Sequence, residues 1–485
     1  MDLNDFFKPA PDLHPMINMG CLMDIPTGIY VPGEHGESIL LGGMGYVEGV
    51  AGRGNVGKST LLHFRELTAL SHLHRALLGY YDTETTMRPM RLNALYASIT
   101  HQPGVDLTDP PRIQITDNTV MSGNEWFAKF RELGRAKIKD RKAYTATTPF
   151  WNAKTKSLIT TYYPTLFGMD SLSQFMTDSV DGIFEKNEVG DSGANTVFMK
   201  GGAAKTQMVM QLPTTTGESG LFITMSIHVG DQIQLDQYAP PKKLLSDMKG
   251  NVTFKNVSGN VSLLMNNLWY VLKSEPLQHK DSKTPLYPKN SEDNLVGDLD
   301  LRLMTVQNLR AKNGPTGMPF ELVWSQSEGI LEGLSEFNFI KTYERYGLSG
   351  NDRNYALDLY PECPLSRTTI RGKIDTDPLL RRALQITSEM CQMKLLWDDP
   401  HGLFITPAEL YRRLKEQGYD WNETLLKTRG YWVYKEDETF EPLPFLSTMD
   451  LLRMATPEGH PQHYVPYWHG ESKHERKSKS KPAAG

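Results

Sequence analysis

The chain has 485 residues, 39% of them hydrophobic and 22% charged, with a net charge of −5. These values indicate a globular protein with room for two or three domains. No apolar run approaches the length of a membrane span, so we expect no contact with a membrane. The N-terminus lacks the basic region and apolar core of a secretory signal, so we expect no such signal. The three cysteines lie far apart and form no metal-spaced pair, so we expect a cytoplasmic protein with no disulfide framework.

Four regions follow one another along the chain. Residues 1–45 form an N-terminal lead that is rich in proline, glycine and methionine. Residues 46–345 alternate short apolar runs with helical patterns, and residues 346–470 are predicted to form a smaller, mainly helical module. Residues 471–485 carry five Lys and Arg against two acids, and this composition predicts a disordered basic tail.

Short apolar runs in the second region predict strands. Several are apolar almost throughout, which is typical of strands that are buried on both faces of a parallel sheet. The predicted strands span residues 45–51, 76–82, 164–170, 220–227, 266–273, 301–308 and 319–325. The fold class that follows is α/β, with a mainly parallel twisted sheet flanked by helices.

Capping signals predict two helices in the third region. Residues 376–397 show an amphipathic pattern that begins with Thr376 or Asp377 as the cap. Residues 406–418 begin with a Thr–Pro pair and a glutamate three residues after the threonine, which is the pattern of a capping box.

Two long segments, 185–207 and 230–260, interrupt the second region. We predict that both are loops, which at this length are usually functional or disordered.

One stretch carries a specific chemical signal. Residues 52–59 match the pattern G-x-x-x-x-G-K-[ST] in full, after an apolar strand and before a helical pattern. Its glycines let backbone N–H groups turn inward and form, with the helix N-terminus, a cradle for the phosphates of a nucleotide. Lys58 would reach the β- and γ-phosphates, and Ser59 would ligate Mg²⁺. The predicted nucleotide-binding residues are Gly52, Arg53, Gly54, Asn55, Val56, Gly57, Lys58, Ser59 and Thr60.

A second Mg²⁺ ligand is expected at the end of another strand. The apolar run 164–169 leads into Asp170, whose carboxylate would hold the ion directly or through a water molecule. The alternative is that Asp170 caps the following helix.

Nucleotide hydrolysis also requires a group that orients or deprotonates water. Asp82 and Glu84 stand at the end of the strand that follows the glycine-rich motif and its helix. One residue separates them, so they point the same way if the chain is still extended. Glu84 is the predicted general base, and the alternative is an ordinary polar strand end.

His228 stands at the end of the strand 220–227. A polar side chain there would face the γ-phosphate and report hydrolysis to the segment that follows. The alternative is a structural histidine.

Arg310 and Lys312 stand at the end of the strand 301–308, before an Asn-Gly-Pro turn. Two cations presented together can reach a phosphate on a neighbouring subunit and stabilise charge in the transition state. The alternative is a basic hairpin edge that resists aggregation.

Residues 129–142 form a basic stretch with seven Lys and Arg against two acids. Because the whole chain is acidic, nucleic acid would have to bind at a local patch of this kind. A solvated helix face is an equally good interpretation.

Taken in order, these motifs resemble those of the RecA-like ATPases, most closely the phage recombinases of the UvsX type. The resemblance covers residues 1 to about 345 and is vaguer to about 395. GRGNVGKST resembles the family's P-loop, YYDTETTM its segment with the catalytic glutamate, LFGMDSLSQF its Asp-Ser strand end and SIHVGD its third strand end. The segment FFKPAPDLHPMINM is similar to the family's short N-terminal lead, which implies contact with another protomer.

The resemblance implies a RecA-like P-loop NTPase core that binds ATP and Mg²⁺ and hydrolyses ATP in the presence of DNA. Glu84 then corresponds to the catalytic carboxylate, His228 couples the nucleotide to DNA affinity, and Arg310 and Lys312 act on a neighbouring ATP. The implied activity is exchange between single-stranded and duplex DNA during recombination and repair, with self-association into a filament or ring. A phage source would place the protein in the cytoplasm of a bacterial host.

In this family two DNA-binding loops follow the Asp-Ser strand end and the third strand end. The resemblance therefore implies that these loops lie near residues 185–207 and 230–260. Their lysines are predicted to contact the phosphates of single-stranded DNA. These are Lys200 and Lys205 in the first segment and Lys242, Lys243, Lys249 and Lys255 in the second.

Two features depart from the family. Eighty-five residues separate Glu84 from Asp170, so we expect an insertion within 101–163, with a hairpin at 150–163. The turn RAKNGPTG resembles that of DnaB-type replicative helicases, so a hexameric helicase is the alternative to a recombinase. A nucleotide-switched scaffold without catalysis is a third possibility and would require Glu84 to be inert.

Overall fold

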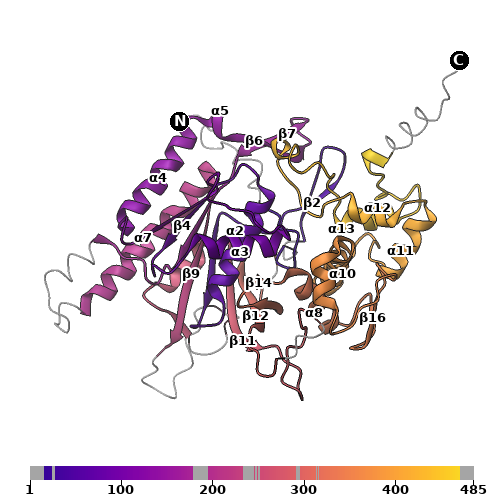
Figure 1. The fold of residues 1–485 in the computed structure, drawn as a ribbon. Coiled ribbons are helices and arrows are strands. Elements are labelled where there is room, and N and C mark those ends of the chain that lie inside the picture. Colours follow the sequence, from indigo (N-terminus) through magenta and orange to yellow (C-terminus); the bar gives the residue numbers. More distant parts are fainter. Residues whose placement is uncertain are drawn as a thin grey trace.

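The computed structural model describes residues 16–24, 28–178, 195–232, 245, 248, 252–290, 295–312, 314 and 316–469. A ten-stranded sheet lies at the centre of this part of the chain (Figure 1). Its strands are β3 (Val47–Gly52), β4 (Leu78–Asp82), β5 (Ile113–Asp117), β8 (Thr165–Asp170), β9 (Leu221–Asp231), β10 (Val252–Phe254), β11 (Asn267–Pro276), β12 (Leu301–Ala311), β13 (Pro319–Ser325) and β14 (Gly329–Ile330).

Most of the sheet is parallel. The order is β14-β13-β12-β11-β3-β9-β8-β4-β5, and β10 pairs with the end of β9. The six strands from β11 to β5 are parallel, whereas β12, β13 and β14 form an antiparallel extension at one edge. The structure therefore confirms an α/β protein with a mainly parallel sheet, and each of the seven predicted strands is present.

Helices cover both faces of the sheet. The helices α2 (Lys58–His72) and α3 (Pro89–Thr100) pack on one face, and α4 (Gly123–Lys139) and α7 (Asn195–Ser219) pack on the other. Neighbouring strand residues alternate between these layers, as Tyr80 does with Tyr81, because successive side chains of a strand point to opposite faces. Both faces of the central strands are therefore buried.

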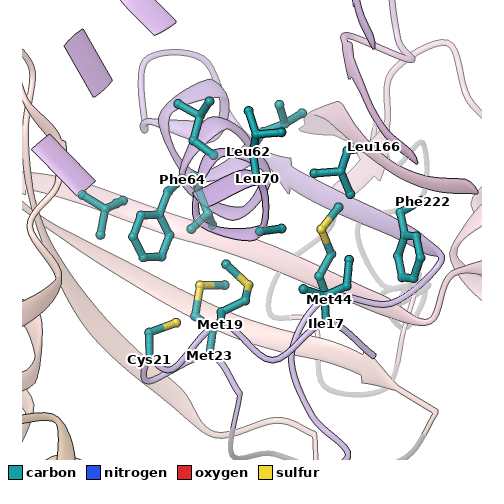
Figure 2. Close-up of a cluster of buried hydrophobic side chains, with 14 of the residues drawn as sticks. Ile17, Met19, Cys21, Met23, Met44, Leu62, Phe64, Leu70, Leu166 and Phe222 are labelled. Carbon is teal, nitrogen blue, oxygen red and sulfur yellow. The ribbon is translucent and has the colours of Figure 1, made fainter. Parts of the chain in front are cut away.

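The N-terminal segment 16–24 belongs to the core of its own chain. Met19, Cys21 and Met23 are each at most 2% exposed. Figure 2 shows them gathered beside Phe64 and Leu70 of α2. The part of the predicted protomer-contact lead that precedes residue 16 lies outside the described residues.

The interval 101–163 divides between the sheet layers and a hairpin. Strand β5 forms one edge of the sheet and α4 covers a face, so both belong to the core. A short helix α5 (Arg141–Tyr144) then leads into a hairpin of β6 (Thr145–Asn152) and β7 (Ser157–Tyr162), as predicted.

The loop predicted at 185–207 is wrong over residues 195–207, and residues 185–194 lie outside the described residues. Residues 195–207 begin helix α7, which continues to Ser219 despite the pair Gly201–Gly202. The helix buries Met208, Val209 and Leu212 against the sheet, and this packing outweighs the low helix propensity of glycine. Within 230–260, the described residues form β10 and a 3₁₀ helix, η2 (Gly259–Leu264).

The C-terminal region adds short helices and one small hairpin. Both helix predictions are confirmed: Asp377 caps α10, and Thr406 caps α11 by accepting a 3.2 Å hydrogen bond from the N–H of Glu409. The elements are α8 (Glu332–Thr342), β15 (Leu348–Asn351), β16 (Asn354–Leu357), α9 (Ile370–Thr376), α10 (Pro378–Leu396), α11 (Pro407–Glu416), α12 (Trp421–Leu426), η3 (Lys435–Asp437) and α13 (Thr448–Met454).

This region packs directly onto the rest of the chain. One apolar cluster runs from Leu301 and Val323 of the sheet through α8 to α10. In Figure 1 the helices α10 to α13 lie on the side of the molecule opposite α4 and α7. A small antiparallel pair, β1 (Tyr30–Pro32) and β2 (Ser38–Leu40), completes the strands of the described chain. No helix in these ranges is both long and apolar enough to cross a membrane.

Candidate functional site

The glycine-rich motif forms the turn between β3 and α2. Gly57 has a φ of 89°, in the left-handed region that favours glycine, and a Cβ there would lie 2.5 Å from Met304 Cε. No side chain caps the N-terminus of α2, so its first N–H groups stay open toward the turn. The turn therefore has the backbone donors that an anion at this helix end would need.

Lys58, the first residue of α2, lies inside this turn. It is 6% exposed, and its Nζ donates a 2.6 Å hydrogen bond to the carbonyl of Arg53. Burial lowers the pKa of Lys58, whereas Asp170 and Glu84 act to raise it. The lysine therefore stands close to both acids that the sequence selected.

Asp170 ends β8 beside this lysine. Its Oδ1 accepts a hydrogen bond from the hydroxyl of Ser226 on β9. The next turn is capped instead by Ser171, whose Oγ accepts from the N–H of Gln174 at 3.3 Å. The carboxylate of Asp170 thus fits the metal-ligand interpretation better than the capping interpretation.

Glu84 projects from a loop that Asp82 shapes. Asp82 is buried, and its carboxylate accepts hydrogen bonds from the N–H groups of Glu84, Thr86 and Met87 at 2.9, 2.6 and 2.6 Å. The expectation that Asp82 and Glu84 point the same way is wrong, because the chain folds back after β4. Asp82 turns inward, while 42% of the Glu84 side chain is exposed.

His228 of β9 meets Glu84 of the β4 loop. The distance between His228 Nε2 and Glu84 Oε1 is 3.2 Å, although the two residues are 144 positions apart. The His228 side chain is 26% exposed. The structure therefore brings together Lys58, Asp170, Glu84 and His228 at the carboxyl ends of neighbouring parallel strands.

Hydroxyl groups that the sequence reasoning missed tie these strand ends together. Thr83 Oγ1 accepts from the N–H of Ser171 at 2.6 Å, which links β4 to β8. Ser173 Oγ accepts from the N–H of His228 at 2.9 Å, which links the β8 end to β9. The signal available in the sequence was a Ser or Thr within three residues of each strand end.

An ion pair borders the site. Arg53 Nη1 lies 3.0 Å from Asp231 Oδ2, and both side chains are well exposed. Lys255 lies near this ion pair, because a Cβ on Gly230 would come within 2.6 Å of Lys255 Cε. The charge of Lys255 acts on the pKa values of both Asp231 and Lys58. This predicted DNA contact therefore stands beside the glycine-rich turn.

Another predicted DNA contact does not fit. Lys205 is 5% exposed on α7, and its Nζ donates a 2.7 Å hydrogen bond to the carbonyl of Ser173. Burial lowers the pKa of Lys205 to about 8. Its ammonium supports the turn after β8 and is not presented to a phosphate. The other four predicted lysines, or their side chains, lie outside the described residues: Lys200, Lys242, Lys243 and Lys249.

Arg310 and Lys312 lie away from this cluster. Arg310 pairs with Leu268 of β11, and Leu268 in turn pairs with Gly49 of β3. Gly49 lies three residues before Gly52, where the glycine-rich turn begins. Because β12 runs antiparallel to β11, Lys312 lies farther still from the glycine-rich turn. Within one chain these two cations do not join the site.

Ser59 and Asp170 carry oxygen atoms of the kind that Mg²⁺ prefers, and phosphates and water would have to complete a ligand set. No group of three or more His, Cys, Asp or Glu side chains in the described ranges is arranged to hold a metal ion.

The chain matches no protein-family model, and no curated protein matches it. Its function therefore has to be inferred from the chemistry of the site.

Proposed function

We propose that the chain is an ATP-dependent recombinase that binds single-stranded DNA through a RecA-like P-loop ATPase core. The observation that carries this proposal is the 3.2 Å contact between Glu84 and His228, beside Lys58 and Asp170. In this proposal the general base, Glu84, would be in direct contact with the strand that leads to the second predicted DNA-binding segment.

ATP binding would use the turn between β3 and α2. Lys58 would exchange the carbonyl of Arg53 for phosphate oxygens, and the open N–H groups of α2 would complete the cradle. Ser59 and Asp170 would hold Mg²⁺, whose charge would stabilise the phosphate oxygens during transfer.

Hydrolysis would then use Glu84 as the base. Its carboxylate takes a proton from a water molecule, the water oxygen bonds to the γ-phosphorus, and the bond to the bridging oxygen breaks to release ADP. The contact with His228 must open for Glu84 to reach the water. Hydrolysis is thereby linked to the position of His228 and of the residues that follow it.

The surface of α4 supports a polyanionic partner. Arg131, Arg135 and Lys139 are spaced four residues apart, which places them along one side of the helix. Arg135 and Lys139 are exposed and Arg131 is half-buried. Lys137 is the exception within this stretch, because it is buried and donates a 2.7 Å hydrogen bond to the carbonyl of Tyr163.

The position of Arg310 and Lys312 supports a proposal of self-association. Since they do not join the site of their own chain, they would act on the ATP of a neighbouring protomer. A head-to-tail contact of this kind produces either an open filament or a closed ring.

The experiment compares the wild-type protein with Glu84→Gln and with a surface control, Glu423→Gln. ATP hydrolysis is measured with and without single-stranded DNA. Glu84→Gln should retain ATP-dependent DNA binding and lose about 10²–10⁴-fold in turnover, while the control keeps wild-type activity. Full ATPase activity in Glu84→Gln would remove this residue from the role of base.

Electron microscopy of the protein on single-stranded DNA with a slowly hydrolysed ATP analogue tests the assembly. Open helical filaments support the recombinase. Closed six-membered rings would favour the helicase, and a wild-type protein without DNA-stimulated ATP turnover would favour a nucleotide-switched scaffold.

A further inference from the structure

A cavity, separate from the glycine-rich turn, lies between the sheet layer and the C-terminal region. Its volume is about 510 Å³, within the range of small-molecule sites. Helices α2 and α3 form one wall, and α8, α10, α12 and the segment 428–431 form the other. The residues that carry the argument are Thr68, Glu332, Glu336, Arg381, Arg382 and Arg429.

Three guanidinium groups face this cavity. Arg382 and Arg429 are 7% and 6% exposed. Arg382 donates to the carbonyl of Leu446 and to the side-chain oxygen of Gln385, and Arg429 donates to the carbonyl of Tyr431. The Nε atoms of both have no hydrogen-bond partner in the described chain. Arg381 binds the carbonyls of Ile374 and Asp375 at 2.7 and 3.2 Å. All three side chains remain cationic at neutral pH.

Carboxyl groups also line this cavity. Burial raises the pKa of both Glu332 and Glu336, which favours their neutral forms. Glu441 does carry charge, because His74 lies 3.3 Å from its carboxylate and lowers its pKa. The wall therefore brings three arginines close to glutamates whose charged forms are disfavoured by burial.

Further polar atoms in the wall lack partners. Thr68 Oγ1 and Glu336 Oε1 are buried without a hydrogen bond to any group in the described ranges. Such groups are normally satisfied by protein, water or ligand. Beside them, the ring of His72 stacks on Tyr431 with their centroids 3.4 Å apart, and Tyr96 and Ile99 add apolar surface.

We propose that this cavity binds an organic anion that carries a phosphate group and has about the size of a mononucleotide, at a site separate from the β3–α2 turn. The guanidinium groups and the Thr68 hydroxyl are hydrogen-bond donors that suit phosphate oxygens. The cavity is too large for inorganic phosphate alone, and its aromatic and aliphatic surface fits an organic body.

The test measures binding by calorimetry in the Lys58→Ala background, so that the β3–α2 turn does not contribute. The probes are AMP, ribose 5-phosphate and orthophosphate. We expect AMP to bind at one site per chain with the same affinity in Lys58→Ala and wild-type protein. Because the assay requires no ATP hydrolysis, its result is independent of the proposed ATPase activity.

Two variants locate the site. Arg381→Gln removes one cation and should weaken AMP binding about tenfold or more. Thr68→Val keeps the side-chain volume and should weaken binding several-fold, and it should not lower the thermal midpoint because the hydroxyl has no partner to lose. Arg412→Gln is the matched control, because Arg412 lies on the exposed face of α11 and pairs only with Glu409 and Glu416.

The absence of saturable AMP binding would overturn the proposal, as would AMP binding that persists in both cavity variants. Equal affinity for orthophosphate and AMP would show that the cavity binds only a phosphate ion, and would refute the proposal that it binds an organic anion. AMP binding that disappears in Lys58→Ala and survives in Arg381→Gln would assign the ligand to the β3–α2 turn.

Discussion

A buried ion pair joins the strand and the helix on either side of the glycine-rich turn. Glu48 of β3 and Arg65 of α2 are each 0% exposed, with 2.6 Å between Arg65 Nε and Glu48 Oε2 and 2.8 Å between Arg65 Nη2 and Glu48 Oε1. Glu48 Oε1 also accepts from the side chain of Asn267 and the N–H of Gly45. We expect this pair to fix α2 against the sheet.

The substitution Glu48→Gln removes the negative charge and almost no volume. Arg65 would keep its hydrogen bond to the Gly43 carbonyl and its position over the Trp269 ring, but its charge would have no counter-ion. Removing one partner of a buried pair typically costs about 3–5 kcal/mol. Because the glutamine amide oxygen can still accept one hydrogen bond, we expect a loss of about 3 kcal/mol from the free energy of unfolding.

Urea denaturation at pH 7, followed by tryptophan fluorescence and circular dichroism, measures this loss. Glu423→Gln, which removes one partner of the exposed pair Glu423–Lys427, is the control and should leave the midpoint nearly unchanged. The double variant Glu48→Gln/Arg65→Met removes the unpaired charge and should regain at least about 1 kcal/mol.

Two results would refute this reasoning. One is a loss below about 1 kcal/mol in Glu48→Gln. The other is a double variant that is less stable than the single variant, since the unpaired guanidinium would then not be the cause of the loss.

Three further predictions concern pH, metal binding and DNA. Burial lowers the pKa of His72 from 6.5 to about 3, so the neutral imidazole stabilises the folded chain fully above pH 6.5 and this stabilisation is lost as the pH falls from 6.5 toward 3. When the pH is lowered from 7 to 5, the free energy of unfolding of His72→Phe should therefore fall by about 2 kcal/mol less than that of the wild type. Denaturation at both pH values measures the difference. Asp170→Asn should abolish Mg²⁺-dependent ATP hydrolysis while the circular dichroism spectrum stays unchanged, and full activity would remove this residue from the metal site. Lys255→Gln should reduce the salt dependence of DNA binding by about one ion, whereas Lys205→Met should leave it unchanged because Lys205 is buried; equal effects of the two substitutions would contradict these positions.

The central strands could be predicted because both faces of each strand are buried, which leaves continuous apolar runs such as the one in β9. Strand β5 was missed because it lies at the sheet edge and alternates apolar with polar residues. Helix α7 was missed because its first turns contain two glycines, and only the packing of Met208 and Leu212 reveals it.

Part of the candidate site could likewise be predicted from the sequence, and part could not. Lys58, Asp170, Glu84 and His228 could be selected because parallel strands present their carboxyl ends at one edge of a sheet. The inward turn of Asp82 could not be predicted, because it depends on three backbone N–H groups that converge only when the loop folds.

Positions that depend on tertiary packing were beyond the reach of the sequence. The burial of Lys205 follows from the path of α7 past the Ser173 carbonyl. The cavity of about 510 Å³ brings Thr68 of α2 beside Arg429, more than three hundred residues away in sequence, and no periodic pattern connects such residues.

Helix α2 connects the two sites. Its first residue is Lys58 of the glycine-rich turn, Arg65 fixes its middle to β3, and Thr68 and His72 near its end line the cavity between the sheet layer and the C-terminal region. Fifteen residues of α-helix span about 22 Å, so the two sites lie at opposite ends of one helix. Linkage then requires that AMP in the cavity change the affinity of the turn for ATP by the same factor by which ATP changes the affinity of the cavity for AMP. Both factors can be measured by calorimetry in Glu84→Gln, where ATP is not consumed, and a factor of one in both directions would show that the two sites are independent.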